Sequence, residues 1–322
     1  GESALTAVSL IYPLQNLSLA FSCGVGIAMN ALIARHLGAH NHQEASFVAS
    51  QGIVMTLLHS LLFVILGLFF IQPFMTLFTQ NPEVIRYGQE YGVIVITLTF
   101  STFIHLAIEK MFQACGNMII PMIMQMVGAI VNIILDPIFI FGLDLGVKGA
   151  AFATVISQFI SALWTLRFLT GKKTILKIKK QYLSLKVKYV TKIISLGMAG
   201  FMMAITNSIV TIVCNATLQQ YGGDLYIAIM TIINSIREVA SLPGQGMANA
   251  CQPVLGFNYG AKEYARVLQG IKFVTLTALS MMLIVWLAIT VFPELFIKIF
   301  SHNQEIITHG VSALRLYFFG FF

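Results

Sequence analysis

Two stretches of the sequence resemble each other at a fixed separation, and this repeat limits the folds that the chain can adopt. The segment 78–88 reads FTQNPEVIRYG and aligns with FSHNQEIITHG at 300–310, with a separation of 222 residues and five identical pairs out of eleven. The same separation aligns Gly24, Ala28, Gly38 and Ala39 with Gly246, Ala250, Gly260 and Ala261. Duplicated sets of hydrophobic helices are typical of secondary transporters, whose substrate path lies between the repeats. The repeat therefore predicts a transporter.

The composition of the chain predicts that it lies in a membrane. Hydrophobic residues make up 57% and charged residues 10%, whereas soluble domains carry about 25% charged residues. A helix needs roughly 20 apolar residues to cross a bilayer. Nine segments meet this need: 4–34, 48–78, 85–109, 118–142, 147–169, 189–219, 224–256, 268–299 and 305–322. The polar alternation of a transmembrane β-barrel is absent, so the prediction is an all-α membrane protein.

Lysine and arginine concentrate at alternate ends of these segments, which predicts the orientation of the chain. Fourteen lie at one set of ends and three at the other, and the positive-inside rule places the richer set in the cytoplasm. The richer set is Arg35, Lys110, nine residues between 167 and 192, Lys262, Arg266 and Lys272; the opposite set is Arg86, Lys148 and Lys298. We therefore expect a multi-pass protein of the cytoplasmic membrane, in a bacterium.

The repeat also predicts how the halves are built. The helix at 189–219 opens the second half, so its partner should precede residue 1, and counterparts of 118–169 should follow residue 322. The parent protein would then hold twelve helices in two parallel six-helix repeats, nine of them visible here, because an even number of helices gives both halves the same orientation. We expect an amino-terminal lobe (1–170), a basic cytoplasmic linker (171–188) and a carboxyl-terminal lobe (189–322).

The basic linker could in principle be a nucleic-acid site. Such a site would need aromatic residues among the basic ones and a soluble fold around it. Here the basic stretch joins two apolar helices, which favours a connector beside anionic lipid. We therefore expect membrane lipid and small molecules as partners, with no nucleic acid.

An acidic residue within an apolar segment is the strongest candidate for ion coupling. Asp136 costs roughly 2.5–3.5 kcal/mol to insert into a bilayer on translocon scales, and it shares one helix face with Gly128 and Asn132 because the three are spaced by four. Pro137 leaves the carbonyl of residue 133 without its usual donor and is a candidate hinge. Carboxylate, amide and carbonyl oxygens together suit a proton or a small hard cation. The alternative is a simple kink near the outer helix end, where the carboxylate meets water.

The next apolar segment adds a hydroxyl to this candidate site. It opens GAAFAT at 149–154, and its small residues permit close contact between helices. That contact would bring Thr154 towards Asp136. Read alone, Thr154 is better explained as a packing residue, and its role in the site depends on Asp136.

Polar residues at matching depth in the two halves predict a substrate cavity. Arg237 and Glu238 lie near the middle of segment 224–256, with Asn234 one turn earlier, and the repeat places Gln15 and Asn16 at the positions of the two charges. Neighbouring residues on a helix point about 100° apart, so Arg237 and Glu238 cannot easily pair with each other. The alternative is that a further helix neutralises these charges for packing alone.

Enzyme chemistry has no support in the sequence. The four cysteines and seven histidines are scattered without metal-ligand spacing, and neither a phosphate-binding loop nor a dinucleotide fingerprint is present. We therefore expect no catalytic residues, no metal and no cofactor beyond H⁺ or Na⁺ as coupling ion, in a protein that works as a monomer.

Four motifs resemble the multidrug and toxic compound extrusion (MATE) family. They are NALIARHLGA at 30–39, NIILDPIFI at 132–140, GAAFAT at 149–154 and QPVLGFNYGAK at 252–262. The resemblance implies a twelve-helix exporter with two lobes in a V, which expels amphipathic, often cationic compounds in exchange for protons or sodium. It also implies that Asn132, Asp136 and Thr154 belong to an ion network in the amino-terminal lobe, with Tyr91 as a further aromatic member.

The sequence departs from the family pattern in two places. The first helix, which carries another acid in one branch of the family, is missing, and segment 189–219 contains no acid while 305–322 offers Arg315. We therefore predict coupling through Asp136 in the amino-terminal lobe. The alternative function is a flippase for lipid-linked oligosaccharides on a related fold, which should have a strongly cationic cavity.

Overall fold

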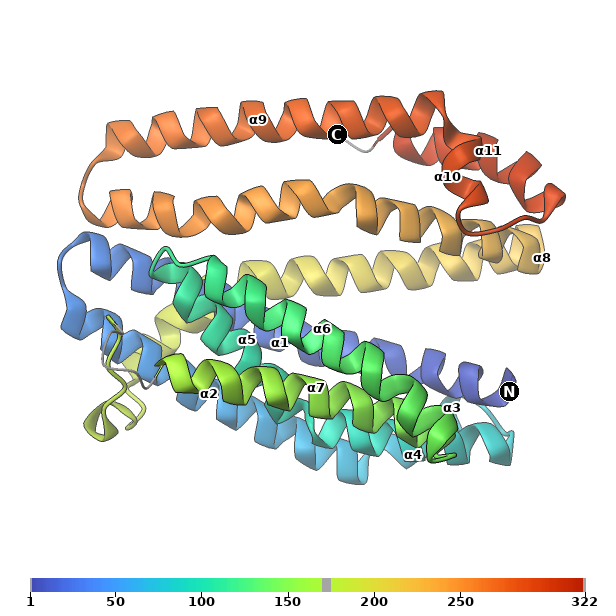
Figure 1. Ribbon diagram of the computed structural model, residues 1–322, viewed down its shortest axis with the longest axis horizontal. Helices are drawn as coiled ribbons and strands as arrows, with labels where there is room; N and C mark the ends of the chain where they lie inside the picture. The colour runs from blue at the N-terminus through green and yellow to red at the C-terminus, as the bar shows by residue number, and fades with distance from the viewer. Residues whose placement is uncertain (1, 170–174, 321–322) are drawn as a thin grey trace. The chain divides into compact units, whose positions relative to one another are not determined.

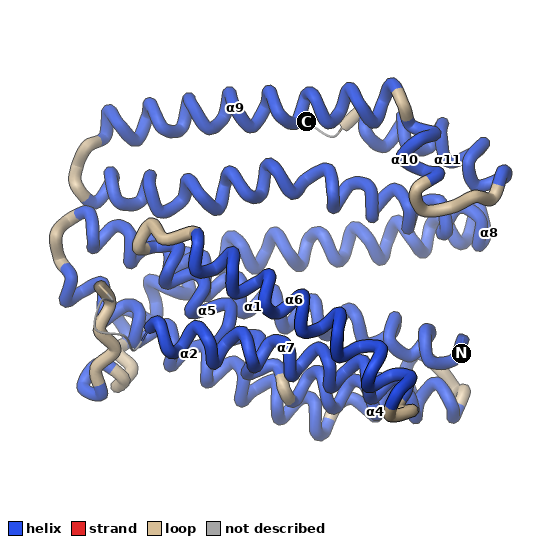
Figure 2. The backbone as a smooth tube through the Cα atoms, in the orientation of Figure 1, coloured by secondary structure: helices blue, strands red, loops and turns tan. Residues whose placement is uncertain are grey.

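A computed structural model describes residues 2–169 and 175–320, which are helical and contain no strand (Figure 2). The first part of the chain forms α1 (Glu2–Gly38), α2 (His42–Phe69), α3 (Ile71–Phe78), α4 (Pro82–Thr97), α5 (Thr99–Ala114), α6 (Ile119–Pro137), the π-helical η1 (Ile138–Gly142) and α7 (Gly146–Leu169). The second part forms the short η2 (Lys180–Tyr182), α8 (Val187–Gly260), α9 (Tyr264–Val291), α10 (Pro293–Lys298) and α11 (Gln304–Phe318) (Figure 1).

Eight helical segments of the described residues are long and apolar enough to cross a membrane. They coincide with the first eight predicted segments, and two of them, Val187–Thr211 and Leu225–Gly260, belong to the single helical element α8, which continues through the predicted break near residue 222. The ninth predicted segment, 305–322, corresponds to α11, whose 15 described residues span about 22 Å and fall short of the roughly 30 Å hydrocarbon core.

The repeat is present in the structure as well as in the sequence. Helix boundaries recur with the same separation of 222 residues: α1 and α8 end at Gly38 and Gly260, α2 and α9 begin at His42 and Tyr264, α3 and α10 begin at Ile71 and Pro293, and α4 and α11 begin at Pro82 and Gln304. Helix caps recur too, because the Oδ1 atoms of Asn81 and Asn303 accept from the second backbone N–H that follows, at 3.0 and 2.9 Å. The two halves therefore share one backbone plan.

Two glycines at equivalent positions make a close contact between helices. A Cβ atom added to Gly38 would overlap the carbonyl oxygen of Phe257, and one added to Gly260 would overlap that of Arg35. These four residues are two pairs related by 222 residues, so each repeat presents the same glycine to the carbonyl of the other. Only glycine permits such an approach of backbone to backbone.

The helices form two compact units, residues 1–206 with 256–262 and residues 207–255 with 263–322. In the first unit, α1, α2, α4 and α5 pack against one another. Helix α7 packs against α4 and α5 and also against α6. The first unit also includes the beginning of α8, because Gly24 and Gly197 allow the two backbones to touch; a Cβ on Gly197 would lie 2.6 Å from the Gly24 oxygen. The predicted lobe boundary at residue 189 stays a prediction.

The basic linker is more ordered than a solvated connector would be. Its residues 171–174 lie outside the described residues, but the part that follows is held against α2 by Gln51, which is fully buried. The Gln51 amide donates to the carbonyls of Tyr182 and Ser184 at 2.7 and 2.8 Å and accepts from the Lys186 N–H at 2.9 Å. Gln51 therefore makes three hydrogen bonds to the linker, and Ser46 of the same helix adds one by accepting from the Lys177 N–H at 3.1 Å.

Candidate functional site

Asp136 lies one residue before the end of α6, where the helix geometry changes. Pro137 ends α6, and in the π-helical η1 the Leu143 N–H donates to the Ile138 carbonyl at 2.8 Å, five residues back. Such π-helical turns occur mostly as local irregularities, often at functional sites. Asp136 is half-buried, and the Asn132 amide donates to its Oδ1 at 3.4 Å. The predicted face of α6 therefore exists, with an irregular turn directly after it.

The aromatic member expected from the family resemblance, Tyr91, is a buried residue of α4. The Gln15 amide of α1 donates to the Tyr91 hydroxyl at 3.4 Å. The structure thus joins α1 to α4 through Gln15 and Tyr91, and Asn132 to Asp136 within α6. Both hydrogen bonds are long, so the group is loosely bonded and its oxygens remain available.

Thr154 belongs to the helix that packs along α6. Its hydroxyl donates to the Ala150 carbonyl within α7 at 3.0 Å, which leaves its lone pairs as acceptors. A Cβ on Gly128 would lie 2.7 Å from the Ser161 hydroxyl, and one on Gly149 would lie 2.6 Å from the Phe139 backbone. Between those two contacts, the antiparallel register places Thr154 at the depth of Asp136. The predicted close contact through small residues is therefore present.

Arg237 and Glu238 line a cavity of about 750 Å³ in the second unit. Asn207, Ser241, Leu242, Gln245, Tyr317 and Gly320 complete its lining. Among the ion pairs of the described residues, none joins the two charges, and the buried Arg237 Nε has no hydrogen-bond partner in the described part of the chain. Asn234 is half-buried one turn away. The cavity offers one positive and one negative side chain to a bound molecule.

The other predicted cavity residues lie in the first unit. Asn16 is half-buried on α1, and Gln15 contacts Tyr91 as described above. The hypothesis that all five residues line one substrate cavity stays a prediction. Among the described residues, no group of three or more His, Cys, Asp or Glu side chains is placed to hold a metal ion.

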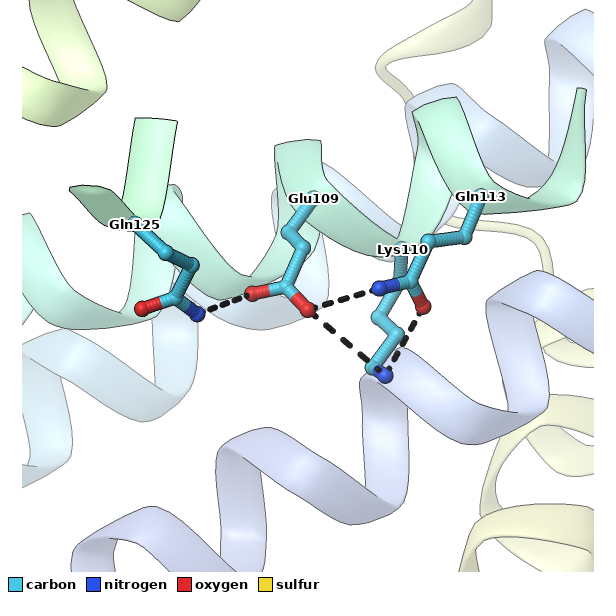
Figure 3. Close-up of polar contacts among 4 residues, drawn as sticks. All are labelled: Glu109, Lys110, Gln113 and Gln125. Carbon is cyan, nitrogen blue, oxygen red and sulfur yellow. Dashed lines mark hydrogen bonds and ion pairs between the residues drawn. The ribbon is translucent and has the colours of Figure 1, made fainter. Parts of the chain in front are cut away.

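One polar group was missed by the sequence analysis. Glu109, Lys110 and Gln113 of α5 are buried, and Glu109 accepts a hydrogen bond from the amide of the exposed Gln125 of α6 (Figure 3). The sequence analysis ended this segment at residue 109 and counted Lys110 among the loop cations, which is wrong because α5 continues to Ala114 and Lys110 is 6% exposed. The spacing of four between Glu109 and Gln113 was the available signal.

Comparison with known proteins places the chain in a family. The sequence profile of the MatE family matches residues 1–138 and 199–322, which together cover most of the chain in two stretches. The chain belongs to the MatE family. This membership confirms the resemblance expected from the four motifs and agrees with the duplicated all-α fold.

Characterised relatives of this MatE protein include bacterial exporters. The multidrug export protein MepA of Staphylococcus haemolyticus is 25% identical over 312 residues, covering 97% of this chain and 69% of the relative. MepA of Staphylococcus saprophyticus is 25% identical over 317 residues, covering 98% and 70%. The long apolar helices and these relatives agree with the predicted multi-pass transporter of a bacterial cytoplasmic membrane.

Solved structures of MATE proteins share the fold. A MATE transporter in complex with MaL6 matches with a TM-score of 0.93 at 25% identity, covering 100% of this chain and 74% of that chain. A multidrug resistance MATE transporter of the MOP superfamily in an outward-facing conformation matches at 0.92 and 26% identity, with coverage of 98% and 70%. A MOP superfamily transporter from Pyrococcus furiosus matches at 0.92 and 25%, with coverage of 98% and 71%.

Proposed function

We propose that this MatE transporter exports amphipathic, often cationic drugs or toxic compounds in exchange for H⁺ or Na⁺, with coupling through Asp136. The observation that carries the proposal is the position of Asp136, a carboxylate within the apolar α6 that accepts a hydrogen bond from Asn132 and lies directly before the π-helical turn. Ionisable residues inside the membrane are costly and are functional candidates by default.

The chemistry of the group suits a small hard cation. Asp136 offers carboxylate oxygens, Asn132 an amide oxygen, and Tyr91 and Thr154 hydroxyl oxygens, and such ligands bind hard cations or exchange protons. The loose hydrogen bonds of 3.4 Å support exchange, because little bonding is lost when an ion or proton arrives.

The transport cycle that we propose has three steps. In the outward-facing state Asp136 takes up the coupling ion, which neutralises its charge and changes the packing around Pro137. This change favours release of the drug outside, since an ion can shift a conformational equilibrium only by binding the two states with different affinity. Return to the inward-facing state frees the ion and lets the next substrate enter from the cytoplasm.

The substrate class rests on the relatives and on the cavity of the second unit. The staphylococcal relatives are multidrug export proteins, and Glu238 gives the cavity a group that attracts cations. A flippase for lipid-linked oligosaccharides would need a strongly cationic cavity, whereas here Arg237 shares the cavity with a carboxylate. The exporter is therefore the better-supported function.

The test uses the complete transporter in vesicles, with efflux of a fluorescent cationic dye as the readout. Proton and sodium gradients are imposed separately on wild type and on Asp136→Asn, which keeps the size of the side chain and removes its charge. We expect efflux driven by one of the two gradients and a loss of at least 100-fold in the variant.

A matched control is Asp144→Asn, since Asp144 is an acid in the loop that follows η1. It should transport as wild type does. Normal efflux by Asp136→Asn would contradict coupling through this residue, and no dye movement under either gradient would favour the flippase.

A further inference from the structure

Glu109 and Lys110 form a buried polar network with two amides (Figure 3). Their side chains are 3.9 Å apart, too far for a direct hydrogen bond, and Gln113 bridges them: it donates to Glu109 Oε1 at 2.7 Å and accepts from Lys110 Nζ at 2.9 Å. The second carboxylate oxygen, Oε2, accepts from Gln125 at 3.0 Å. Glu109 is 7% exposed and Lys110 6%.

Stability alone does not account for such a pair. Burying two charges costs several kcal/mol per ion, and well-packed apolar residues of the same volume often stabilise as well or better. A buried ion pair near the carboxyl-terminal end of the apolar helix α5 is therefore a candidate for a role in transport.

The bonding of Glu109 selects a proton over a metal ion. Both oxygens of its carboxylate face N–H donors, and the Gln113 oxygen accepts from the Lys110 ammonium. A sodium ion would need several free oxygen ligands and would lie beside a positive charge. A proton needs only one lone pair of the carboxylate.

A polar face of α6 leads from Asp136 to this network. Gln125, Gly128, Asn132 and Asp136 are spaced by three or four residues, so they share one side of the helix. Asn132 bonds Asp136 at one end of this face, and Gln125 bonds Glu109 at the other. Gln125 is itself exposed, and its amide donates to the buried carboxylate of Glu109. It therefore connects the exposed face of α6 to that carboxylate.

The neighbouring helices line the same route with polar side chains. Thr154, Ser157 and Ser161 share one face of α7, and Ser161 contacts α6 by donating to the Met124 carbonyl at 3.1 Å. On α5, His105 lies one turn before Glu109, is 4% exposed, and has no hydrogen-bond partner for either ring nitrogen in the described part of the chain. Buried polar atoms of this kind commonly bond to water.

We propose that Glu109 is a second protonation site, which receives the coupling proton from Asp136 and delivers it to the cytoplasm. The proposal rests on the proposed function, because Asp136 is the entry site, and it identifies the coupling ion as H⁺. The O–H bond of the Asp136 carboxyl breaks, water carries the proton along the polar face of α6, and an O–H bond forms on Glu109. Glu109 then gives the proton to a water or buffer base in the cytoplasm.

Three charged or titratable side chains of the described residues are placed near Glu109 on its own helix and on α1. Lys110 and His105 lie on its own helix, and Cys23 of α1 is close enough to feel the charges of Glu109 and Lys110. From α6 comes the neutral Gln125 amide. Protonation of Glu109 removes the charge from the hydrogen bond that Gln125 donates and so weakens it, which loosens the contact between α5 and α6 and links the proton to a change in helix packing.

The test counts protons moved per substrate exported in weakly buffered vesicles that hold the complete transporter. We expect Glu109→Gln to lose at least tenfold in gradient-driven export and to lose the dependence of its rate on cytoplasmic pH. Its substrate affinity without a gradient should stay within twofold of wild type. Glu294→Gln, which removes the carboxylate of the exposed 2.7 Å pair with Lys298, is the charge-matched control and should change nothing.

The outcomes separate this proposal from the proposed function. A wild-type proton count and rate in Glu109→Gln, with Asp136→Asn inactive, would overturn the second site alone; normal transport in both would overturn both. If Glu109→Gln fails to fold, Glu109→Gln with Lys110→Met restores a neutral network, and coupled transport by that variant would also overturn the proposal.

Gln125→Leu keeps both charges; we expect at least threefold slower proton delivery, and an unchanged rate would count against the route.

Discussion

The two repeats share a backbone plan but differ in their charges. Helix ends, asparagine caps and close glycine contacts recur with a separation of 222 residues, whereas Gln15 and Asn16 of the first repeat correspond to Arg237 and Glu238 of the second. In the first pair Gln15 donates a hydrogen bond to Tyr91, and the second pair lines a cavity. Duplication has thus kept the residues that pack helices and has let the polar residues diverge.

This difference suggests that the two repeats have different roles in transport. Packing positions are constrained because a close-packed interior tolerates little change in volume, so the shared plan says little about function. The polar positions carry the chemistry of each half: an acid with oxygen-bearing neighbours in the first, and a mixed-charge cavity in the second. Matched substitutions at the two places test this difference.

The largest difference is expected between the two intramembrane acids. Asp136→Asn should abolish gradient-driven export, at least 100-fold, because it removes the coupling group. Glu238→Gln should keep the number of protons or sodium ions per substrate and change the apparent substrate affinity several-fold, because it removes one charge from the cavity. Ion and substrate fluxes measured together in vesicles check both expectations. An altered number of ions per substrate in Glu238→Gln would contradict the proposal that the two repeats have different roles.

The two contact glycines should behave alike. Gly38→Ala and Gly260→Ala each introduce a Cβ that overlaps a carbonyl oxygen of the other repeat, and overpacking of this kind costs about 1–3 kcal/mol. We expect both variants to lower the midpoint of thermal unfolding in detergent by similar amounts. Gly246→Ala, where an added Cβ meets nothing within 4 Å, is the control. A strong effect at only one of the two contact positions would show that the contact is not equivalent in the repeats.

The sequence was sufficient to predict the shared plan of the repeats. The separation of 222 residues and the apolar segments predicted the duplicated all-α membrane fold, because each residue pattern is local to one helix. The face formed by Asn132 and Asp136 was also predictable, since spacing by four fixes which side chains share a helix side. The family resemblance added Tyr91, and its membership of an ion network with Asp136 stays a prediction.

The network around Glu109 was not predicted, for a physical reason. Its members come from two helices, and a boundary error of five residues placed Lys110 in a loop, where a charge needs no partner. Nothing in the local pattern reveals that Gln125 of another helix reaches Glu109. The hydrogen bonds from Gln51 to the linker were not predicted for the same reason, because they join residues more than 130 positions apart.

Gln51 is a further difference between the two repeats, because its counterpart in the second repeat is the exposed Phe273. Gln51→Leu removes three hydrogen bonds to the linker, and loss of a buried polar partner costs about 1–3 kcal/mol. We expect a protease that cleaves after basic residues to cut the linker several-fold faster in the variant. Phe273→Leu should leave cleavage unchanged, and equal cleavage of wild type and Gln51→Leu would show that other contacts hold the linker.

The smallest effects are expected at the two helix caps, which should be equal if the repeats are equivalent outside their polar sites. Asn81 and Asn303 cap α4 and α11 through the same hydrogen bond, and both side chains are exposed. Replacing an asparagine cap by alanine costs about 1 kcal/mol. Asn81→Ala and Asn303→Ala should therefore each lower the unfolding midpoint by a few degrees and leave ion stoichiometry unchanged. A cap variant that altered coupling in one repeat only would mean that the divergence extends beyond the polar sites to the helices that carry them.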